Sequence, residues 1–170
     1  MTAEGPHSNP GLLAGHATVA EAAALLPTEP LAVSPHTSVA ELVERLAHRP
    51  SVHTIAVVDE ANHLIGVIPL SRLVDDLFLR VAPEVFLRHL LDAKAGPEDL
   101  QAHTARTAGE LMEAPLSVRE TSTVRDAFRI MREHHLEAIP VVDEEQRVVG
   151  ELDLVELLLL WLRALQPHLP

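Results

Sequence analysis

Three groups of side chains in this sequence of 170 residues could do chemistry: paired carboxylates, histidines and scattered arginines. Asp153 and Glu156 are three residues apart, so on a helix they would share one face. Carboxylates there could accept hydrogen bonds from ligand hydroxyl groups or cap the helix itself. Together with Asp75–Asp76 and Glu144–Glu145 they could also bind a hard cation through oxygen, although runs of charge usually form a solvated face.

The histidines do not predict a zinc site, and no motif predicts catalysis. Eleven histidines are spread along the chain without an H-x-x-x-H pair, and adjacent His134 and His135 would point in different directions on a helix. There is no cysteine to add thiolate ligands or a nucleophile. Neither a G-x-S-x-G elbow nor a glycine-rich phosphate loop is present. We therefore expect a protein that is not an enzyme.

Composition and charge exclude several kinds of partner. The 13 basic and 25 acidic residues give a formal charge of 13 − 25 = −12, so nucleic acid is not an expected partner. Four aromatic residues in all, Phe78, Phe86, Phe128 and Trp161, leave no platform for stacking bases. No secretory signal and no apolar stretch of membrane-spanning length is visible. We expect no membrane insertion, and a cytoplasmic location.

An internal repeat organises the chain. Shifted by 85 positions, residues 31–42 match residues 116–127, and shifted by 84 positions, residues 55–66 match residues 139–150. In each copy a short apolar run leads to a candidate capping box, Ser38-x-x-Glu41 or Thr123-x-x-Asp126, with a helix expected to follow. Two β-branched strands with a polar turn come next, and then a second helix from about Leu70 or Leu154. The order is strand, helix, strand, strand, helix, twice.

This doubled pattern resembles a tandem pair of cystathionine-β-synthase (CBS) domains, which is also called a Bateman module. The resemblance rests on the residue runs 110–112, 123–127, 139–143 and 148–150 and covers roughly residues 22–165 apart from the middle. It implies an α+β fold in which two βαββα repeats pack about a pseudo-twofold axis and leave clefts for adenine nucleotides or similar ligands. The domains we expect are a disordered tail at 1–17, a first repeat at 18–75, a helical insert at 76–106 and a second repeat at 107–166.

At the end of each repeat the sequence departs from the family pattern, which is glycine, two apolar residues, a hydroxyl residue, two variable residues and aspartate. In the first copy Pro69 replaces the hydroxyl residue, and Arg72 replaces the ribose-binding aspartate. In the second copy Asp153 replaces the hydroxyl residue, while Glu156 could still bind a ribose. The ligand-binding residues that the resemblance implies are Val33, Pro69, Arg72, Val118, Arg119, Ile139, Pro140, Asp153 and Glu156.

Each of these residues also has a plain structural interpretation. Pro69 suits the first turn of a helix, and Asp153 could serve only as a helix cap. Against a phosphate, Asp153 and Glu156 would each cost on the order of 4 kcal/mol at 4 Å with an effective dielectric constant of 20. Arginines could offset this repulsion. The candidates are Arg72, Arg119, Arg125, Arg129 and Arg132, most of which occupy helix positions that normally face water.

The insert between the copies and the terminal helix of the second copy are candidates for further contacts. The insert is expected to hold a helix from Pro83 and another from Pro97 to Met112, packing on the module or docking a partner. The terminal helix is apolar nearly all round, so it needs cover on more than one side. We expect a homodimer, with burial inside one chain as the alternative. The predicted dimer residues are Leu157, Leu158, Trp161 and Leu165.

Two functions remain open. The first is a regulatory ligand-sensing module that binds an adenosine-type ligand or a cation in the cleft between its repeats, the candidates being AMP, ATP, S-adenosylmethionine and Mg²⁺. The second is a degenerate CBS pair that binds no small molecule and acts as a dimeric scaffold for a partner transporter or enzyme.

Overall fold

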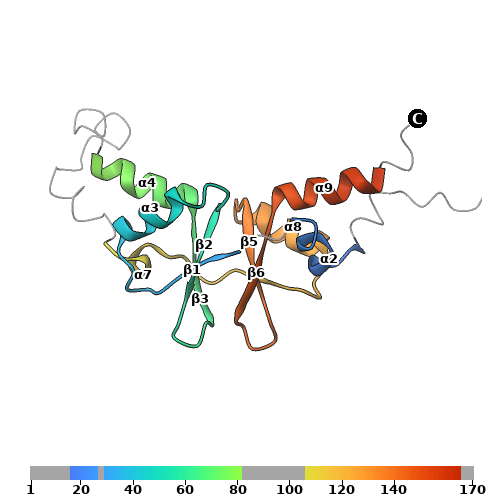
Figure 1. Ribbon diagram of the computed structural model, residues 1–170, viewed down its shortest axis with the longest axis horizontal. Helices are drawn as coiled ribbons and strands as arrows, with labels where there is room; N and C mark the ends of the chain where they lie inside the picture. The colour runs from blue at the N-terminus through green and yellow to red at the C-terminus, as the bar shows by residue number, and fades with distance from the viewer. Residues whose placement is uncertain (1–15, 27–28, 82–105, 166–170) are drawn as a thin grey trace, which may run out of the picture. The chain divides into compact units, whose positions relative to one another are not determined.

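The computed structural model describes residues 16–26, 29–81 and 106–165, and it confirms the α+β class (Figure 1). Two compact units divide the chain, one formed by Leu31–Pro115 and the other by Leu116–Pro170 together with the chain before residue 31. We call them the first and the second unit. Most of the expected insert and the expected N-terminal tail lie outside the described residues, including the helix predicted from Pro83.

The first unit follows the predicted order of elements. It contains β1 (Leu31–Val33), α3 (Val39–Ala47), β2 (Thr54–Val58), β3 (Leu64–Pro69), α4 (Leu70–Val81) and the short α7 (Ala108–Leu111). β1 pairs with β2 in parallel, and β2 pairs with β3 antiparallel. Only the last part of the helix predicted from Pro97 to Met112 is described, and there the prediction of one continuous helix is wrong: Thr107 is an extended N-cap, α7 begins at Ala108, and Met112 is extended again.

The second unit repeats this order. It contains α2 (Val19–Ala23), β4 (Val118–Arg119), α8 (Val124–Glu133), β5 (Ala138–Val142), β6 (Val148–Asp153) and α9 (Leu154–Leu165). Its sheet has the order β4-β5-β6, again one parallel pairing followed by one antiparallel pairing. The predicted tandem repeat is therefore confirmed at the level of secondary structure and sheet topology.

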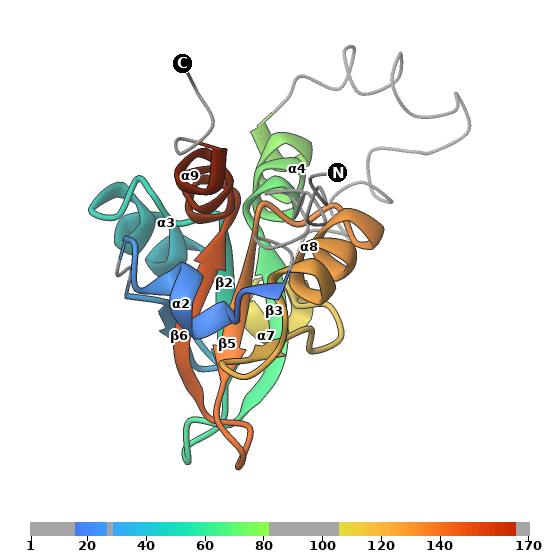
Figure 2. The same ribbon diagram turned by 90° about the vertical axis from the view of Figure 1, so that its right-hand side faces the viewer.

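The short helices α2 and α7 have exchanged places relative to the sequence copies. α2 precedes the first copy but packs on α8, α9 and β6 of the second unit (Figure 2), while α7 packs on β3 of the first. Matched backbone hydrogen bonds hold both helices. Ala108 N donates to Thr37 O at 2.8 Å, and in the same way Val19 N donates to Ser122 O at 2.9 Å. The compact units thus cut across the sequence boundaries that we predicted at residues 18 and 107.

The predicted capping signals start the helices, but only one half of each box forms. Glu41 N donates to the Ser38 hydroxyl at 3.2 Å, and Asp126 N donates to the Thr123 hydroxyl at 3.1 Å. Neither acidic side chain caps the backbone in return, because Glu41 pairs with Arg45 and Asp126 accepts from the Thr123 hydroxyl. Each N-cap still satisfies a backbone N–H that the helix leaves unpaired.

The two hairpins use the same turn. In the first, Asp59 Oδ1 accepts from the backbone N–H groups of Ala61 and His63, and in the second Asp143 Oδ1 accepts from those of Glu145 and Arg147. These aspartates substitute for backbone acceptors and close the turn locally. Each turn also places one residue in the left-handed region, Asn62 with φ 66° and Gln146 with φ 67°.

Each unit has its own apolar core on the helical face of its sheet, and the two cores contain equivalent positions. The first includes Leu42, Ile55, Ile68 and Leu73, and the second includes Ala127, Ile139, Leu152 and Leu157. The prediction that Leu157 lies in a dimer interface is therefore wrong for this side chain, which is 1% exposed inside its own unit. None of the described helices is long and apolar enough to cross a membrane.

Candidate ligand-binding site

The junction between β6 and α9 contains Asp153 and Glu156, the two carboxylates that were predicted from the sequence as ligand-binding residues. Glu156 N donates to Asp153 Oδ1 at 2.8 Å, and Asp153 N donates to Glu156 Oε2 at 2.8 Å. This is a complete reciprocal capping box, built from two acids instead of a hydroxyl residue and an acid. Asp153 is 7% exposed and Glu156 is fully buried. The capping role considered for Asp153 is therefore realised in the structure.

Burial gives this junction unusual acid–base properties. Desolvation raises the pKa of Glu156 to about 7, and the hydrogen bond from the Asp153 backbone opposes that rise only in part. Glu156 Oε1 is buried without a hydrogen-bond partner. A buried unpaired acceptor is costly, so this oxygen would be stabilised by a donor, either its own proton or a ligand hydroxyl group.

A third acid, Glu151, was absent from our predicted site. It is 5% exposed on β6, opposite Pro140 of β5, and burial together with the negative charges of Asp153 and Glu156 raises its pKa to about 8. Its signal in the sequence was an acid within an apolar strand, at the position where the first copy has Val67. The second unit thus clusters three buried carboxyl groups within six residues.

The first unit ends its hairpin without any of these acids. Pro69 is buried at the end of β3, where the register pairs it with Thr54. Leu70 N donates to His53 O at 2.8 Å, which matches the bond from Leu154 N to Glu137 O at 3.0 Å. Arg72, in the first turn of α4, is exposed, and its side chain has no hydrogen bond or ion pair among the described residues.

The other predicted site residues divide between core and surface. Val33, Val118 and Ile139 are each at most 5% exposed and belong to the apolar cores. Pro140 is buried on β5. The side chain of Arg119 is exposed at the end of β4, and its backbone N–H donates to the Ser122 hydroxyl at 3.1 Å. The structure thus joins Asp153 and Glu156 directly and leaves Arg119 and Arg72 as the exposed cations of the predicted set.

No set of three or more acidic, histidine or cysteine side chains with the geometry of a metal site occurs among the described residues. Although Glu151, Asp153 and Glu156 are close in sequence, Asp153 and Glu156 direct one oxygen each to the other residue's backbone. The arrangement therefore offers hydrogen-bond acceptors and a titrating carboxyl, but no preformed cation cage.

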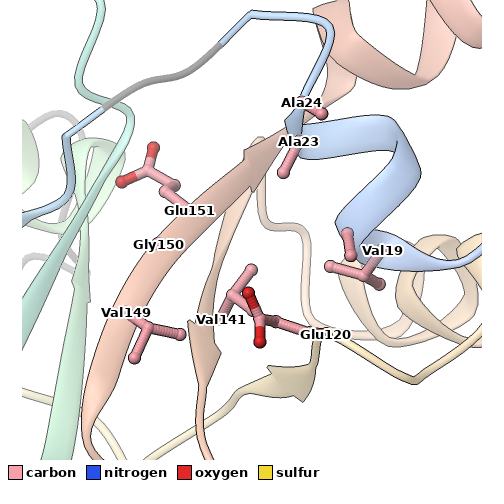
Figure 3. A pocket seen from close by; sticks show the side chains of 9 residues that line it. Val19, Ala23, Ala24, Glu120, Val141, Val149, Gly150 and Glu151 are labelled. Carbon is pink, nitrogen blue, oxygen red and sulfur yellow. The ribbon is translucent and has the colours of Figure 1, made fainter.

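A cavity of about 270 Å³ lies in the second unit between α2 and β6 (Figure 3). Its walls are mostly small or apolar, with the carboxylate of Glu120 added at one side. The lining residues are Val19, Ala20, Ala23, Ala24, Glu120, Val141, Val149, Gly150 and Glu151. None of the nine predicted ligand-binding residues is among them. This cavity is therefore distinct from the site that the sequence predicted.

Known proteins resemble this chain along most of its length. The family model described as the CBS domain matches residues 19–78 and again residues 108–162. A CBS domain-containing protein of Dictyostelium discoideum is 28% identical over 71% of this chain and 77% of its own length. The gamma-3 subunit of human 5'-AMP-activated protein kinase is 42% identical over 31% of this chain. An inosine-5'-monophosphate dehydrogenase of Bifidobacterium longum is 27% identical over 72% of this chain. The chain spans only 10% of the kinase subunit and 19% of the dehydrogenase.

Solved structures agree with the family match. A CBS domain-containing protein from Thermotoga maritima superposes with a TM-score of 0.70 and 26% identity, over 85% of this chain and 93% of that chain. The crystal structure of CBSX2 in complex with AMP, a CBS-pair protein of Arabidopsis thaliana, matches with a TM-score of 0.58 and 26% identity, over 79% and 89%. With the same strand and helix order in both units, this chain belongs to the CBS domain family and contains a tandem CBS pair.

Proposed function

We propose that this chain is a non-catalytic regulatory module that binds an adenosine-type ligand and acts in the cytoplasm on a protein partner. The observation that carries the proposal is the likeness to CBSX2 in complex with AMP, which extends over 89% of that chain. The cytosolic domain of the Mg²⁺ channel MgtE, solved in complex with ATP, is also similar, at 25% identity over 44% of that chain. Both of these proteins were solved in complex with an adenine nucleotide.

Arg72 is the residue that we propose for the phosphate. It occupies the position at which the family pattern places a ligand-facing residue, it is exposed, and it has no partner among the described residues. A guanidinium group can offer two parallel N–H donors to a phosphate, which makes arginine well suited to that contact. Of the two strand–helix junctions, only the first presents such a cation and lacks the repelling carboxylates.

Glu156 is the residue that we propose for a ribose hydroxyl group. Its Oε1 atom lacks a donor, and a ribose diol offers two. Because Glu156 is fully buried, a ribose would reach it only after the β6–α9 junction opens. Opening would also break the reciprocal capping bonds to Asp153, so a ligand at this junction would have to compensate for a lost cap.

A thermal-shift panel of AMP, ATP, S-adenosylmethionine and MgCl₂ tests this function. A ligand at 100 times its dissociation constant stabilises the folded state by about 2.7 kcal/mol, which is readily visible as a raised Tm. We expect a response to at least one adenine compound, and we expect Arg72→Ala to remove it. Arg45→Ala is the matched control, because Arg45 is also exposed in the first unit but pairs with Glu41.

The alternative, a ligand-free scaffold, has one observation in its favour. Asp153 and Glu156 already satisfy the backbone of α9, so the second junction is complete as a structural element without any ligand. No thermal shift with any of the four compounds would favour this alternative. The same result would contradict the proposed ligand-sensing function.

We also propose that the module is a homodimer through the outer face of α9. Val155, Leu158 and Leu162 recur at helical spacing and are 49%, 60% and 47% exposed. Trp161 is half-buried and packs edge-on against Phe128, with ring centroids 5.4 Å apart, and the side chain of Leu165 is not described. Light scattering at tens of micromolar should give twice the chain mass. Leu158→Glu should give a monomer, whereas a wild-type monomer would contradict the proposal.

A further inference from the structure

The two units fill the same place differently, although equivalent contacts hold α2 and α7 there. Gly109 N donates to Pro35 O at 2.8 Å in the first unit, and Ala20 N donates to Glu120 O at 3.1 Å in the second. Both helices begin after a threonine N-cap, Thr107 for α7 and Thr18 for α2. Counting five residues from each cap makes Ala23 of the second unit the counterpart of Met112 in the first.

In the first unit Met112 and Glu113 close the space beside β3. A Cβ atom at Gly66 would lie 2.6 Å from Met112 Sδ and 2.9 Å from Glu113 O, so the methionine side chain lies directly over the glycine. Val67 N donates to Glu113 O at 3.2 Å, and Glu113 N donates to Val67 O at 2.8 Å. An unbranched apolar side chain and one backbone amide pair therefore fill this place.

In the second unit the same place is the cavity between α2 and β6. Ala23 stands where the first unit has methionine, and a Cβ atom at Gly150 would lie 3.7 Å from Val141 Cβ, an ordinary contact. The chain also turns differently: Ala23 is still helical and α2 ends only at Ala24, with ψ −12°, whereas Met112, the counterpart of Ala23, already ends α7 with an extended ψ of 149°. The shorter side chain and the continued helical turn together account for the open volume of about 270 Å³.

The edge of β6 at this cavity resembles the edge that Glu113 occupies in the first unit. Glu151 lies opposite Pro140 in the register in which Val67 lies opposite Ala56. By this equivalence its backbone N–H and C=O face the free edge of the strand. No backbone hydrogen bond joins Ala24 to Glu151 in the described part of the chain. The cavity is therefore bordered by one donor and one acceptor suited to an amide.

The charge around the cavity indicates which charged group a ligand should carry. In Figure 3 the Glu151 carboxylate lies on the side of β6 away from α2, whereas the Glu120 carboxylate points toward the two strands. The Glu120 side chain is exposed and has no hydrogen bond or ion pair within the described ranges. No residue described as lining the cavity is basic. An ammonium group would complement Glu120, and a ligand carboxylate would be opposed by it.

We propose that this cavity is a binding site for a small amino-acid amide with an unbranched apolar side chain. The side chain takes the place that Met112 fills in the first unit, the amide pairs with the backbone of Glu151, and the ammonium group meets Glu120. The site is distinct from the residues proposed for the adenosine-type ligand, so neither proposal depends on the other.

Titration of the full chain with L-methioninamide, followed by isothermal calorimetry or ligand-observed NMR, tests the site. We expect saturable binding that is lost in Ala23→Met, because this substitution restores the side chain with which the first unit fills the space. Ala40→Met is the matched control, since Ala40 is exposed on α3 of the other unit. Absence of binding to the wild-type chain, or binding that survives in Ala23→Met, would overturn the proposal.

A second variant keeps the test decisive if Ala23→Met disturbs folding. Glu120→Gln changes an exposed side chain and should weaken methioninamide binding about two- to fivefold, the range expected for an exposed ion pair. L-Methionine, which carries a carboxylate in place of the amide, should bind more weakly than its amide, and so should branched L-valinamide. Equal binding of all three compounds would contradict the assigned contacts.

Discussion

The two units of this chain share one backbone plan, yet one is closed where the other is open. In the first unit Met112 covers Gly66, and Glu113 pairs with the edge of β3. In the second unit Ala23 takes the equivalent position, and a cavity of about 270 Å³ remains beside Gly150. A change from methionine to alanine, together with one altered turn, is therefore enough to leave a cavity at a strand edge that is otherwise covered.

The junctions at the ends of the hairpins differ in the same way. The first presents buried Pro69 and exposed Arg72, with apolar Val67 two residues earlier. The second presents three buried acids at the equivalent positions, Glu151, Asp153 and Glu156. Because burial favours the protonated form of a carboxylic acid, the second junction should respond to pH in the neutral range through acidic groups that the first junction lacks.

The largest effect should come from that contrast in charge. The pKa of Glu151 is raised to about 8 and that of Glu156 to about 7, so between pH 4.5 and pH 8 the folded state holds protons that the unfolded state releases. The free energy of unfolding should therefore be greatest at the acidic end of this window and fall by several kcal/mol as the pH rises. Urea unfolding at pH 5, 6, 7 and 8 measures this trend.

Replacing Glu151 by valine, the residue at the equivalent position of the first unit, isolates the contribution of Glu151 to this pH dependence. In Glu151→Val the free energy of unfolding should fall less steeply with pH, and at pH 8 the variant should be more stable than the wild-type chain. Glu120→Gln serves as the control, since Glu120 is exposed and should leave the pH trend unchanged. A wild-type stability that is flat or that rises from pH 5 to pH 8 would contradict the raised pKa values.

The glycines give the next largest difference. Gly66→Ala places a Cβ atom 2.6 Å from Met112 Sδ and 2.9 Å from Glu113 O, and it should lower the free energy of unfolding by about 1–3 kcal/mol. Gly150→Ala meets only an ordinary contact at 3.7 Å and should be neutral or stabilising by up to about 1 kcal/mol. Urea denaturation of both variants measures the two changes in the free energy of unfolding. Equal losses in the two would show that the units are equally closed.

The reciprocal cap of α9 should give a smaller effect. Asp153→Ala removes the acceptor of Glu156 N and should cost about 1 kcal/mol of stability. Asp153→Asn keeps a side-chain oxygen at the N-cap and should cost less. The midpoints of chemical denaturation compare these two variants. If the alanine variant were as stable as the wild-type chain, the cap would carry no stability, and a ligand role for Asp153 would gain weight.

The repeat itself explains why much of the fold could be predicted from the sequence. Doubled apolar runs at an offset of 84 or 85 residues placed the hairpin strands and the helices, and α4 and α9 begin at Leu70 and Leu154, where the second helices were expected. Ser38 and Thr123 were recognisable as N-caps because their hydroxyl groups act locally. Such signals depend only on neighbouring residues, so sequence alone reveals them.

Features that depend on tertiary packing were not predictable in this way. Nothing in the local periodicity shows that α2 packs in the second unit, because its apolar residues would suit either core. Leu157 was expected at a dimer interface, but the rotation of α9 directs it into its own core. Glu151 was missed because the strand pattern predicted only that its position is buried, and a buried acid becomes chemically distinctive through its neighbours.

The smallest expected effect concerns the hairpin turns. Each turn has one residue in the left-handed region, but the residue type differs between the two units. Asn62 adopts φ 66° at low cost because its short polar side chain tolerates this conformation, whereas Gln146 adopts φ 67° without that advantage. Gln146→Asn should therefore raise the free energy of unfolding by about 0.5 kcal/mol, and Asn62→Gln should lower it by a similar amount. The melting temperatures of both variants, compared with that of the wild-type chain, measure these two changes in stability. Opposite signs would show that the two turns are equivalent in backbone and differ only in side-chain fitness, whereas two changes of the same sign would mean that one of these residues makes a contact beyond its own turn.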